Sequence, residues 1–265
     1  MKKWLAIILA ICTALTFAAC TKEAPVDNTT TNTDETAKLV VGLDDTFAPM
    51  GFRTEDGELV GFDIDLANAV GEEMGVKMEF KPIIWDAKEM ELDSKKIDMI
   101  WNGMSKTPER VEKMNLSEAY FNNSIVIMTL ADKPIAKKAD LTGLNIGTQA
   151  ASAALEMIQA DAIYGDIVDG LAEYDSYDEA VMDLDAGRLD AVIIDKVAGM
   201  YKANLAQGTY AFAEEDFGED LYVIGMRKGD DELTAKINAA LDAVIASGKA
   251  AEISNKWFGE DLVLR

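Results

Sequence analysis

The stretch Ile97–Arg110, with the sequence IDMIWNGMSKTPER, places a buried strand shortly before the start of a helix. Residues 97–101 are mostly apolar, which is typical of a strand covered on both faces. Thr107 is suited to cap a helix, and Pro108 fits its first position. Arg110 then falls in the first helical turn, where a cation opposes the helix dipole. The segment therefore predicts a strand, a loop and a helix that carries an arginine in an unfavourable place.

Two interpretations of Arg110 are open at this stage. In the first, its guanidinium joins free backbone N–H groups and the Ser105 hydroxyl to hold a carboxylate with bidentate geometry. The interaction of a cation with a helix N-terminus is unfavourable, and an anion fixed beside Arg110 would make the arrangement favourable. In the second, Arg110 makes a surface salt bridge to Glu109 or Glu112.

Strand and helix patterns alternate on the N-terminal side of this segment. Residues 38–43 (KLVVGL) read as a short apolar strand. Within residues 62–74, apolar side chains recur every four residues, which predicts an amphipathic helix that Gly75 closes in a left-handed conformation. Residues 76–81 (VKMEFK) alternate apolar and polar, as in a strand. The order strand, helix, strand implies a parallel sheet with crossover helices.

The same alternation begins again after a basic, proline-containing break. Further strands are expected at residues 123–130, 145–148, 191–194 and 221–226, and helices at residues 151–160, 233–247 and 250–257. Two α/β lobes fit this order better than one sheet. We expect residues 38–129 and 223–265 to build lobe 1, with residues 130–222 inserted as lobe 2. Ligands of open α/β sheets lie beyond the carboxyl ends of the strands, so facing lobes would enclose a cleft that closes by a hinge.

Composition excludes several classes of function. The 265 residues carry 48 acidic and 25 basic side chains, and the net charge of −23 argues against nucleic-acid binding. Histidine is absent, which excludes Ser-His-Asp and Cys-His catalysis and removes the commonest zinc ligand. The acidic clusters lack the spacing of a calcium loop, and no phosphate- or dinucleotide-binding glycine motif occurs. We therefore expect no metal, no cofactor and no catalytic residue.

The N-terminus has the pattern of an export signal. Lys2 and Lys3 precede an apolar run at residues 4–17, and two alanines then lead to Cys20. The run is too short for a spanning helix, and the ordered signature favours a signal over a core helix. Cleavage would remove residues 1–19.

The same segment resembles a bacterial lipoprotein signal. The resemblance implies a lipid on Cys20 and an extracytoplasmic protein anchored to the cell membrane, at the cell surface or in the periplasm. Residues 21–37 are polar, rich in Thr and Asp, and without periodicity. We therefore expect residues 20–37 to form a flexible tether. No second cysteine would remain to form an internal disulfide.

Two aspartates follow apolar strands and could face the cleft. Asp44 ends the strand at residues 38–43, and Asp195 ends the strand at residues 191–194. The natural partner of such a carboxylate is a cation such as a ligand ammonium. The alternative is an Asp that starts a turn or caps a helix.

Aromatic and small residues supply the remaining candidates. Aromatic walls suit an amino-acid side chain, although ordinary core packing is the alternative, and the aromatic candidates near strand ends are Phe47, Phe52, Trp85 and Trp101. Residues 149–153 (QAASA) join a strand to a helix. Their small side chains would let backbone N–H groups approach an anion, with the Ser152 hydroxyl as a further donor.

Taken together, these motifs make the chain similar to the bacterial extracellular solute-binding proteins of family 3, which are polar amino-acid receptors of ABC importers. The resemblance covers residues 38–262, and its strongest stretches are 59–67 (LVGFDIDLA), 102–110, 187–195 (GRLDAVIID) and 256–261 (KWFGED). It implies a two-lobed, type II periplasmic-binding-protein fold of the α/β class. Each lobe would be a mostly parallel sheet flanked by helices, with the ligand in the interlobe cleft. The crossing strands would lie near residues 126–130 and 220–224.

The resemblance also implies how the two ends of a free amino acid are held. Arg110 would bind the α-carboxylate, helped by Ser105 and the region of Ser152. Asp195 and the carbonyl group of Gly103 would take the α-ammonium group. The chain departs from the family at Ala153, where a Thr that commonly donates to the carboxylate is replaced by a residue that cannot.

The side chain of the ligand would meet a second set of residues. Phe47 and Trp85 would pack on it, and Asp44, with Gln149 close by, would face its polar end. The complete set of expected ligand-binding residues is Asp44, Phe47, Trp85, Asn102, Gly103, Ser105, Arg110, Gln149, Ser152 and Asp195.

The resulting functional hypothesis is a non-enzymatic receptor that captures a free amino acid by hinge closure and delivers it to the permease of an ABC importer. We expect a monomer. Its ligand should be neutral polar or cationic, cystine included, because Asp44 and the acidic composition disfavour acidic ligands. The alternatives are an enzyme that resembles cyclohexadienyl dehydratase on the same fold, which would need a positioned general acid, and a surface amino-acid sensor.

Overall fold

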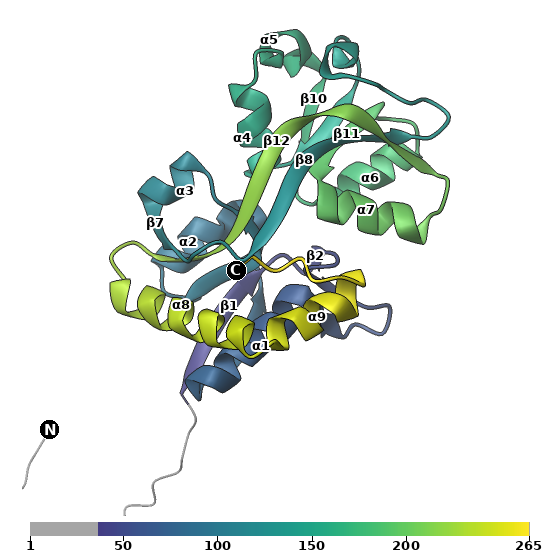
Figure 1. The fold of residues 1–265 in the computed structure, drawn as a ribbon. Coiled ribbons are helices and arrows are strands. Elements are labelled where there is room, and N and C mark those ends of the chain that lie inside the picture. The colour runs from purple at the N-terminus through teal and green to yellow at the C-terminus, as the bar shows by residue number, and fades with distance from the viewer. Residues whose placement is uncertain (1–36, 265) are drawn as a thin grey trace, which may run out of the picture. The chain divides into compact units, whose positions relative to one another are not determined.

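The structure, a computed structural model, describes residues 37–264 (Figure 1). The expected signal (residues 1–19), the lipidation at Cys20 and nearly all of the expected tether (residues 20–37) lie outside the described residues. Among the helices that are described, none combines the length and the hydropathy needed to cross a bilayer.

The chain alternates strands and helices as the sequence predicts. Its strands are β1 (Lys38–Leu43), β2 (Thr46–Phe47), β3 (Gly51–Arg53), β4 (Leu59–Val60), β5 (Lys77–Pro82), β6 (Met99–Ser105), β7 (Met114–Leu116), β8 (Phe121–Leu130), β9 (Ile146–Gln149), β10 (Leu171–Tyr174), β11 (Ala191–Asp195) and β12 (Tyr210–Arg227). Its α-helices are α1 (Phe62–Met74), α2 (Lys88–Asp93), α3 (Pro108–Lys113), α4 (Ala153–Ala160), α5 (Tyr164–Ile167), α6 (Tyr177–Asp185), α7 (Lys196–Leu205), α8 (Asp231–Ala246) and α9 (Lys249–Phe258). Short 3₁₀ turns lie at Trp85–Ala87, Lys138–Leu141 and Val168–Gly170.

The strand β1 and the helix α1 span the residues that their patterns predict. The apolar face of α1 is buried, with Phe62, Leu66 and Val70 fully covered. Gly75 follows in the left-handed conformation, with φ 67°. Local sequence signals therefore decide this part of the fold, because the helix carries its own stop residue and a single apolar stripe.

Most strands join one curved sheet. Its order is β10-β9-β11-β8-β12-β6-β1-β5, with β7 also paired to β12. The pairs β1–β5, β1–β6, β9–β10 and β9–β11 are parallel, as expected from crossover helices, whereas β8 and β12 run antiparallel to their neighbours. We call β1, β5 and β6 with α1–α3, α8 and α9 the first half, and β9–β11 with α4–α7 the second half.

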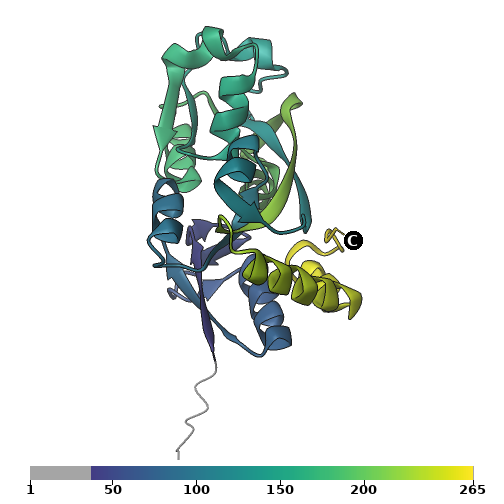
Figure 2. The ribbon, with the colours of Figure 1, turned by 90° about the vertical axis from the view of Figure 1, so that its left-hand side faces the viewer.

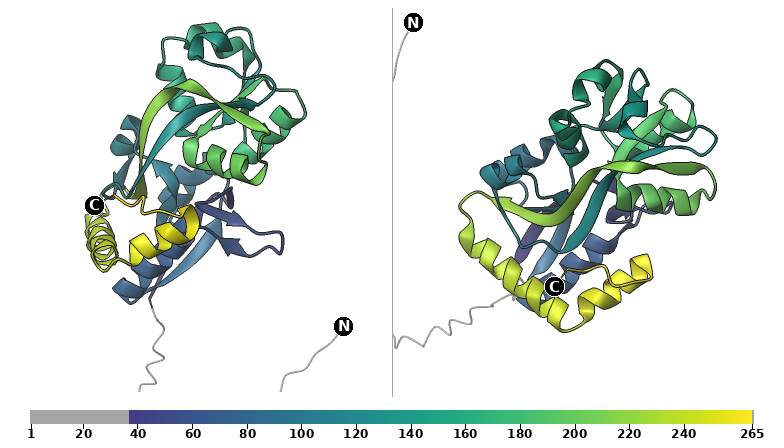
Figure 3. Two further views of the ribbon diagram at one scale, coloured as in Figure 1. Left: turned by 45° about the vertical axis from the view of Figure 1, so that its right-hand side comes forward. Right: turned by 45° about the horizontal axis from the view of Figure 1, so that its top comes forward.

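The two halves are joined by the long strands β8 and β12, which run side by side from one half to the other (Figures 1 and 3). The crossing segments expected near residues 126–130 and 220–224 lie within these strands. Their pairing shifts register between Phe212 and Asp216 and again between Asp216 and Gly218. Such bulges bend and twist an antiparallel pair, so a hinge motion between the halves would take place at this ribbon.

The strand β6 is longer than the apolar run predicts. It starts at Met99 and continues to Ser105, because β12 supplies an antiparallel partner for its second part, with Tyr222 opposite Ser105 and Val223 opposite Met104. Asn102 and Ser105 are therefore strand residues rather than loop residues. The sequence around residue 103 gives no sign of this, since the partner strand lies more than a hundred residues away.

Both ends of the described chain contribute to the first half. Helices α8 and α9 pack on α1, and Figure 2 shows α8 lying beside α1 near the C-terminal residues. Figure 2 also shows the helices of the second half gathered at the other end of the β8–β12 ribbon. Most buried apolar residues form one large cluster that includes Phe62 and Val41 of the first half and Ile193 and Ala180 of the second. A smaller, separate cluster contains Trp85 and the β6 residue Ile100.

Candidate functional site

The residues that the sequence predicts to contact a ligand all line one cavity. The lining consists of Asp44, Phe47, Trp85, Asn102, Gly103, Ser105, Arg110, Gln149, Ser152, Ala153, Tyr177 and Asp195. Ten of these twelve were expected, and Ala153 and Tyr177 are additions. The cavity has a volume of about 10 Å³, which is room for roughly one water molecule. The lining residues come from both halves, which contact each other here.

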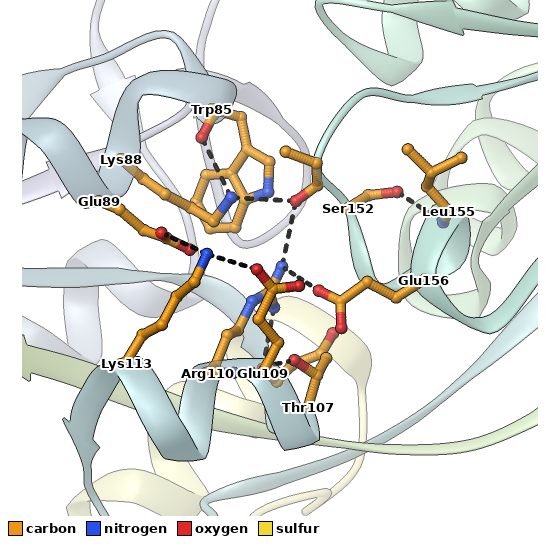
Figure 4. Close-up of polar contacts among 12 residues, drawn as sticks. Trp85, Lys88, Glu89, Thr107, Glu109, Arg110, Lys113, Ser152, Leu155 and Glu156 are labelled. Atoms are coloured by element: carbon orange, nitrogen blue, oxygen red, sulfur yellow. Dashed lines mark hydrogen bonds and ion pairs between the residues drawn. The ribbon is translucent and has the colours of Figure 1, made fainter. Parts of the chain in front are cut away.

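Arg110 projects from the first turn of α3, and its side chain is only 2% exposed (Figure 4). The Thr107 hydroxyl accepts a hydrogen bond from the Arg110 backbone N–H at 3.3 Å and caps the helix as predicted. The guanidinium donates from Nη1 to the Ser105 carbonyl at 2.9 Å and from Nη2 to the Ala151 carbonyl at 3.2 Å. Burial lowers the pKa of this guanidinium, because its positive charge is poorly solvated.

The interpretation of Arg110 as a surface residue is wrong. The carboxylate of Glu109 pairs with Lys113 instead, and Arg110 Nη2 forms an ion pair with Glu156 Oε1 of α4 at 3.8 Å (Figure 4). Because α3 turns the Arg110 side chain inward, its charge is available to the cavity rather than to solvent.

A pair of buried carboxylates lies where β11, β8 and β12 meet. Asp195 accepts hydrogen bonds from Asn123 Nδ2 and from the Tyr222 hydroxyl, both at 2.7 Å. The same Asn123 amide donates to Asp220 at 3.2 Å, and the Ser105 hydroxyl donates to Asp220 at 2.7 Å. Burial raises the pKa of both carboxyl groups, and each negative charge opposes the other.

A third carboxylate occupies the region expected to face the ligand side chain. Asp44 Oδ2 accepts a hydrogen bond from Gln149 Nε2 at 2.8 Å, so the two residues expected to be neighbours are in contact across the halves. Asp44 Oδ1 accepts from the Thr46 hydroxyl at 2.6 Å and from its N–H at 2.9 Å. Burial raises the pKa of Asp44. The Asp44 N–H donates to Asn102 Oδ1 at 3.0 Å, which orients the Asn102 amide.

Two polar atoms at the cavity have no hydrogen-bond partner among the described residues. They are Asn102 Nδ2 and the Tyr177 hydroxyl, and both residues are almost fully buried. An unpaired buried polar group costs about 1–3 kcal/mol, so a ligand that supplies partners here would gain that amount of stabilisation. Tyr177 also packs its ring on Phe47, with centroids 6.0 Å apart.

The segment expected to receive the carboxylate forms the start of α4. The Ser152 hydroxyl accepts a hydrogen bond from the Leu155 N–H at 3.1 Å and so caps the helix. Ala153 is the first helical residue, and N–H groups in the first turn of a helix have no partner within it. The preceding Ala151 has φ 50°, in the left-handed region, which directs its carbonyl oxygen toward Arg110.

The remaining aromatic candidates divide into two groups. Trp85 lies beside the cavity, with the Arg110 guanidinium 5.9 Å from its ring centroid. Phe52 instead packs on Tyr201 and Trp257, and Trp101 packs on Tyr120 within the core. The core interpretation therefore holds for Trp101, and neither Phe52 nor Trp101 lines the cavity.

Sequence reasoning missed four residues of this arrangement. They are Asn123, Tyr177, Asp220 and Tyr222. Asp220 lies in an acidic stretch that reads as a solvated face, and Tyr177 follows Ser176 at the start of a helix. The packing of α6 brings Tyr177 to the cavity, and the pairing of β8 with β12 brings the other three together around Asp195.

Comparison with known proteins identifies the class. Residues 39–260 match the model of the bacterial extracellular solute-binding proteins, family 3, and the chain belongs to this family. The L-arginine-binding protein of Pseudomonas aeruginosa is 35% identical over 84% of this chain and 88% of that protein. The L-cystine-binding protein TcyJ of Escherichia coli is 30% identical over 86% of this chain and 85% of that protein.

Solved structures confirm the two-lobed α/β fold. A substrate-binding protein of an ABC uptake transporter from Streptococcus pneumoniae, with bound histidine, has a TM-score of 0.83 and 37% identity over 86% of this chain and 95% of that chain. An ancestral arginine-binding protein bound to arginine has a TM-score of 0.80 and 36% identity over 84% and 99%. An ancestral amino acid-binding protein, AncCDT-1, a precursor of cyclohexadienyl dehydratase, has a TM-score of 0.75 and 31% identity over 84% and 96%.

Proposed function

We propose that this protein captures a free polar amino acid outside the cytoplasm and delivers it to the permease of an ABC importer, without catalysing a reaction. One observation carries the proposal: the guanidinium of Arg110 and the carboxylate of Asp195 line the same cavity and come from opposite halves of the molecule. A free amino acid presents a carboxylate and an ammonium group a few bonds apart. It can therefore pair with both residues and hold the two halves together.

The size of the cavity implies that binding is coupled to opening and closing. A space of about 10 Å³ does not admit an amino acid. An amino acid can therefore enter only when the hydrogen bonds between the halves break. The chief ones join Gln149 to Asp44 and Arg110 to Ala151. Bending at the β8–β12 ribbon supplies this motion, and the ligand then replaces the lost contacts. Closure around the ligand removes water and strengthens each charge pair.

The chemistry at the Asp44 end favours a neutral polar or cationic side chain. Asp44 is a buried carboxylate, and a second carboxylate beside it would be repelled. The unpaired Asn102 Nδ2 and Tyr177 hydroxyl offer further polar contacts. The names of relatives that bind arginine, histidine and cystine support this choice.

The proposal includes an anchor. A lipid on Cys20 would hold the receptor at the extracytoplasmic face of the membrane, while residues 21–37 let the domain reach the permease as a monomer. Replacing Cys20 by Ala should release the protein from the membrane fraction, which immunoblotting of fractionated cells would detect. Retention of that variant in the membrane would remove the anchor from the proposal.

The central test is the charge of Arg110. Isothermal calorimetry against the twenty L-amino acids and L-cystine should find at least one ligand for the wild-type protein. Arg110→Met should weaken its binding by about 30-fold or more, because truncating one partner of a buried charge pair costs about 2–5 kcal/mol. Arg188→Met is the matched control, since Arg188 lies at the surface with its side chain 62% exposed. Unchanged affinity in Arg110→Met would refute the assignment.

A further inference from the structure

Lys88 is a buried cation that the function described so far does not use. It is the first residue of α2 and is only 3% exposed. Among the described residues, no carboxylate lies within 4 Å of its ammonium group. Its Nζ donates instead to the Ala151 carbonyl at 3.0 Å and to the Trp85 carbonyl at 3.4 Å. A buried ammonium group that no carboxylate contacts directly is costly, so its position calls for an explanation.

Lys88 and Arg110 share one acceptor. Both side chains donate to the carbonyl oxygen of Ala151, from Nζ at 3.0 Å and from Nη2 at 3.2 Å. Both also lie over the ring of Trp85, 5.1 and 5.9 Å from its centroid (Figure 4). Two like charges repel each other at such a separation unless an anion lies between them. The carbonyl oxygen satisfies their hydrogen bonds but carries no full negative charge, and Glu156 Oε1 lies 3.8 Å from Arg110 Nη2, at the limit of an ion pair.

The shared acceptor belongs to the opposite half. Ala151 lies between β9 and α4, whereas Lys88 and Arg110 lie on α2 and α3 of the first half. When the halves separate to admit a ligand, Ala151 leaves with α4, and the donors of Lys88 and Arg110 are uncovered together. Lys88 does not line the closed cavity, because the Ala151 oxygen lies between the two donors.

We propose that Lys88 is a second carboxylate-binding residue, and that it and Arg110 together grip the carboxylate of the bound amino acid. This inference rests on the proposed function and narrows its ligand class. A carboxylate-binding region with two cations favours a ligand group with a full negative charge over a neutral carbonyl group. The site therefore selects free amino acids over amino-acid amides, esters and the carbonyl groups of peptides.

The test compares variants that differ in one charge. Lys88→Met keeps the apolar stem and removes the ammonium group, and Lys88→Gln is a second neutral variant. Lys113→Met is the matched control, because Lys113 lies nearby on α3 but pairs with Glu89 and Glu109 at the surface (Figure 4). The probe is the tightest binder among L-arginine, L-histidine, L-glutamine and L-cystine, together with the α-carboxamide of that amino acid. Circular dichroism establishes that each variant is folded.

We expect Lys88→Met and Lys88→Gln to weaken binding of the free amino acid by about 10- to 100-fold, the usual worth of a charge-assisted hydrogen bond. Binding of the carboxamide should change much less, so the preference for the acid should fall in both variants. Lys113→Met should bind both probes as the wild-type protein does.

Proton uptake gives an independent readout. The charged groups that act on Lys88 are Arg110 of α3, Glu156 of α4, and Asp86 and Glu89 on its own segment; burial and Arg110 lower its pKa to about 8. A carboxylate beside Lys88 would raise this pKa, so binding at pH 8.5 should take up protons. Calorimetry in two buffers of different ionisation enthalpy measures this uptake, which should be smaller in Lys88→Met than in the wild-type protein.

Each result decides the question. Wild-type affinity in both neutral variants overturns the inference while leaving the role of Arg110 intact. An equal loss for acid and carboxamide, with unchanged proton uptake, overturns it too, because Lys88 would then only hold the halves together through Ala151. If the wild-type protein binds no member of the panel, the proposed function fails, and the inference fails with it.

Discussion

At the scale of single residues, Gly103 shows how closely the cavity wall is built. Its φ of 54° lies in the left-handed region, and its N–H donates to Asp63 Oδ2 at 2.6 Å. A Cβ atom at this position would lie 2.6 Å from Cε1 of Phe47 and 3.0 Å from Cε2 of Tyr222. Only glycine allows the rings of Phe47 and Tyr222 to approach the strand β6 this closely.

Replacing Gly103 by Ala should therefore destabilise the domain by about 2–5 kcal/mol, the sum of backbone strain and overpacking. Gly57→Ala is a control, because Gly57 also has a positive φ of 81°, but nothing lies within 4 Å of the point that a Cβ atom would occupy there. It should cost only the strain, about 1–2 kcal/mol. Urea unfolding measures both values. Equal losses in the two variants would contradict the steric argument.

At the scale of elements, the helix α3 has a sequence typical of an exposed helix but directs the Arg110 side chain toward the cavity. Thr107 caps the helix, Pro108 starts it, and Arg110 then faces inward. Thr107→Ala should cost about 1 kcal/mol of stability and weaken amino-acid binding, because the first turn of the helix loses its cap. Thr107→Ser keeps the hydroxyl and should retain affinity. Calorimetry and urea unfolding separate the two effects; full affinity in Thr107→Ala would show that the cap does not position Arg110.

The same scale shows how far sequence reasoning reaches. The helix α1, the cap at Thr107 and the strand ends at Asp44 and Asp195 follow from signals within about fifteen residues, and the structure bears them out. The ten expected residues around the cavity come from such signals joined to the family resemblance.

The residues that sequence reasoning missed depend on distant pairing. Asp220 lies beside the Ser105 hydroxyl because β12 aligns it with Asn123 of β8, and Lys88 contacts the Ala151 carbonyl because its side chain extends past Trp85 to the opposite half. The extension of β6 to Ser105 has the same cause. No local pattern distinguishes Asp220 or Lys88 from the many exposed charges of this acidic chain, so their burial becomes evident only in the folded structure.

At the scale of the whole molecule, buried carboxyl groups set the pH dependence of stability. Burial raises the pKa of Asp63 from 3.8 to about 7, and the pKa values of Asp195 and Asp220 are also raised. Between about pH 4 and 7 the folded state therefore binds more protons than the unfolded state. Stability must then fall as pH rises through this window.

We expect the ligand-free domain to unfold at a higher urea concentration at pH 5 than at pH 7.5. Asp195→Asn should flatten this dependence, because one of the responsible groups is removed. Ligand affinity should follow the opposite trend and increase toward pH 7.5, since an ionised Asp195 is needed to pair with an ammonium group. A ligand-free domain that gains stability between pH 5 and 7.5 would contradict the argument.

The path of the chain through the two halves has a consequence for biosynthesis. The helices α8 and α9 are made last, yet they cover α1, which is made near the start. A nascent chain that ends before Asp231 already contains every residue that lines the cavity, but the part of α1 that α8 and α9 cover is still exposed. The half that is synthesised first is therefore completed last. A truncated product would expose apolar surface to chaperones and proteases before it could serve as a receptor.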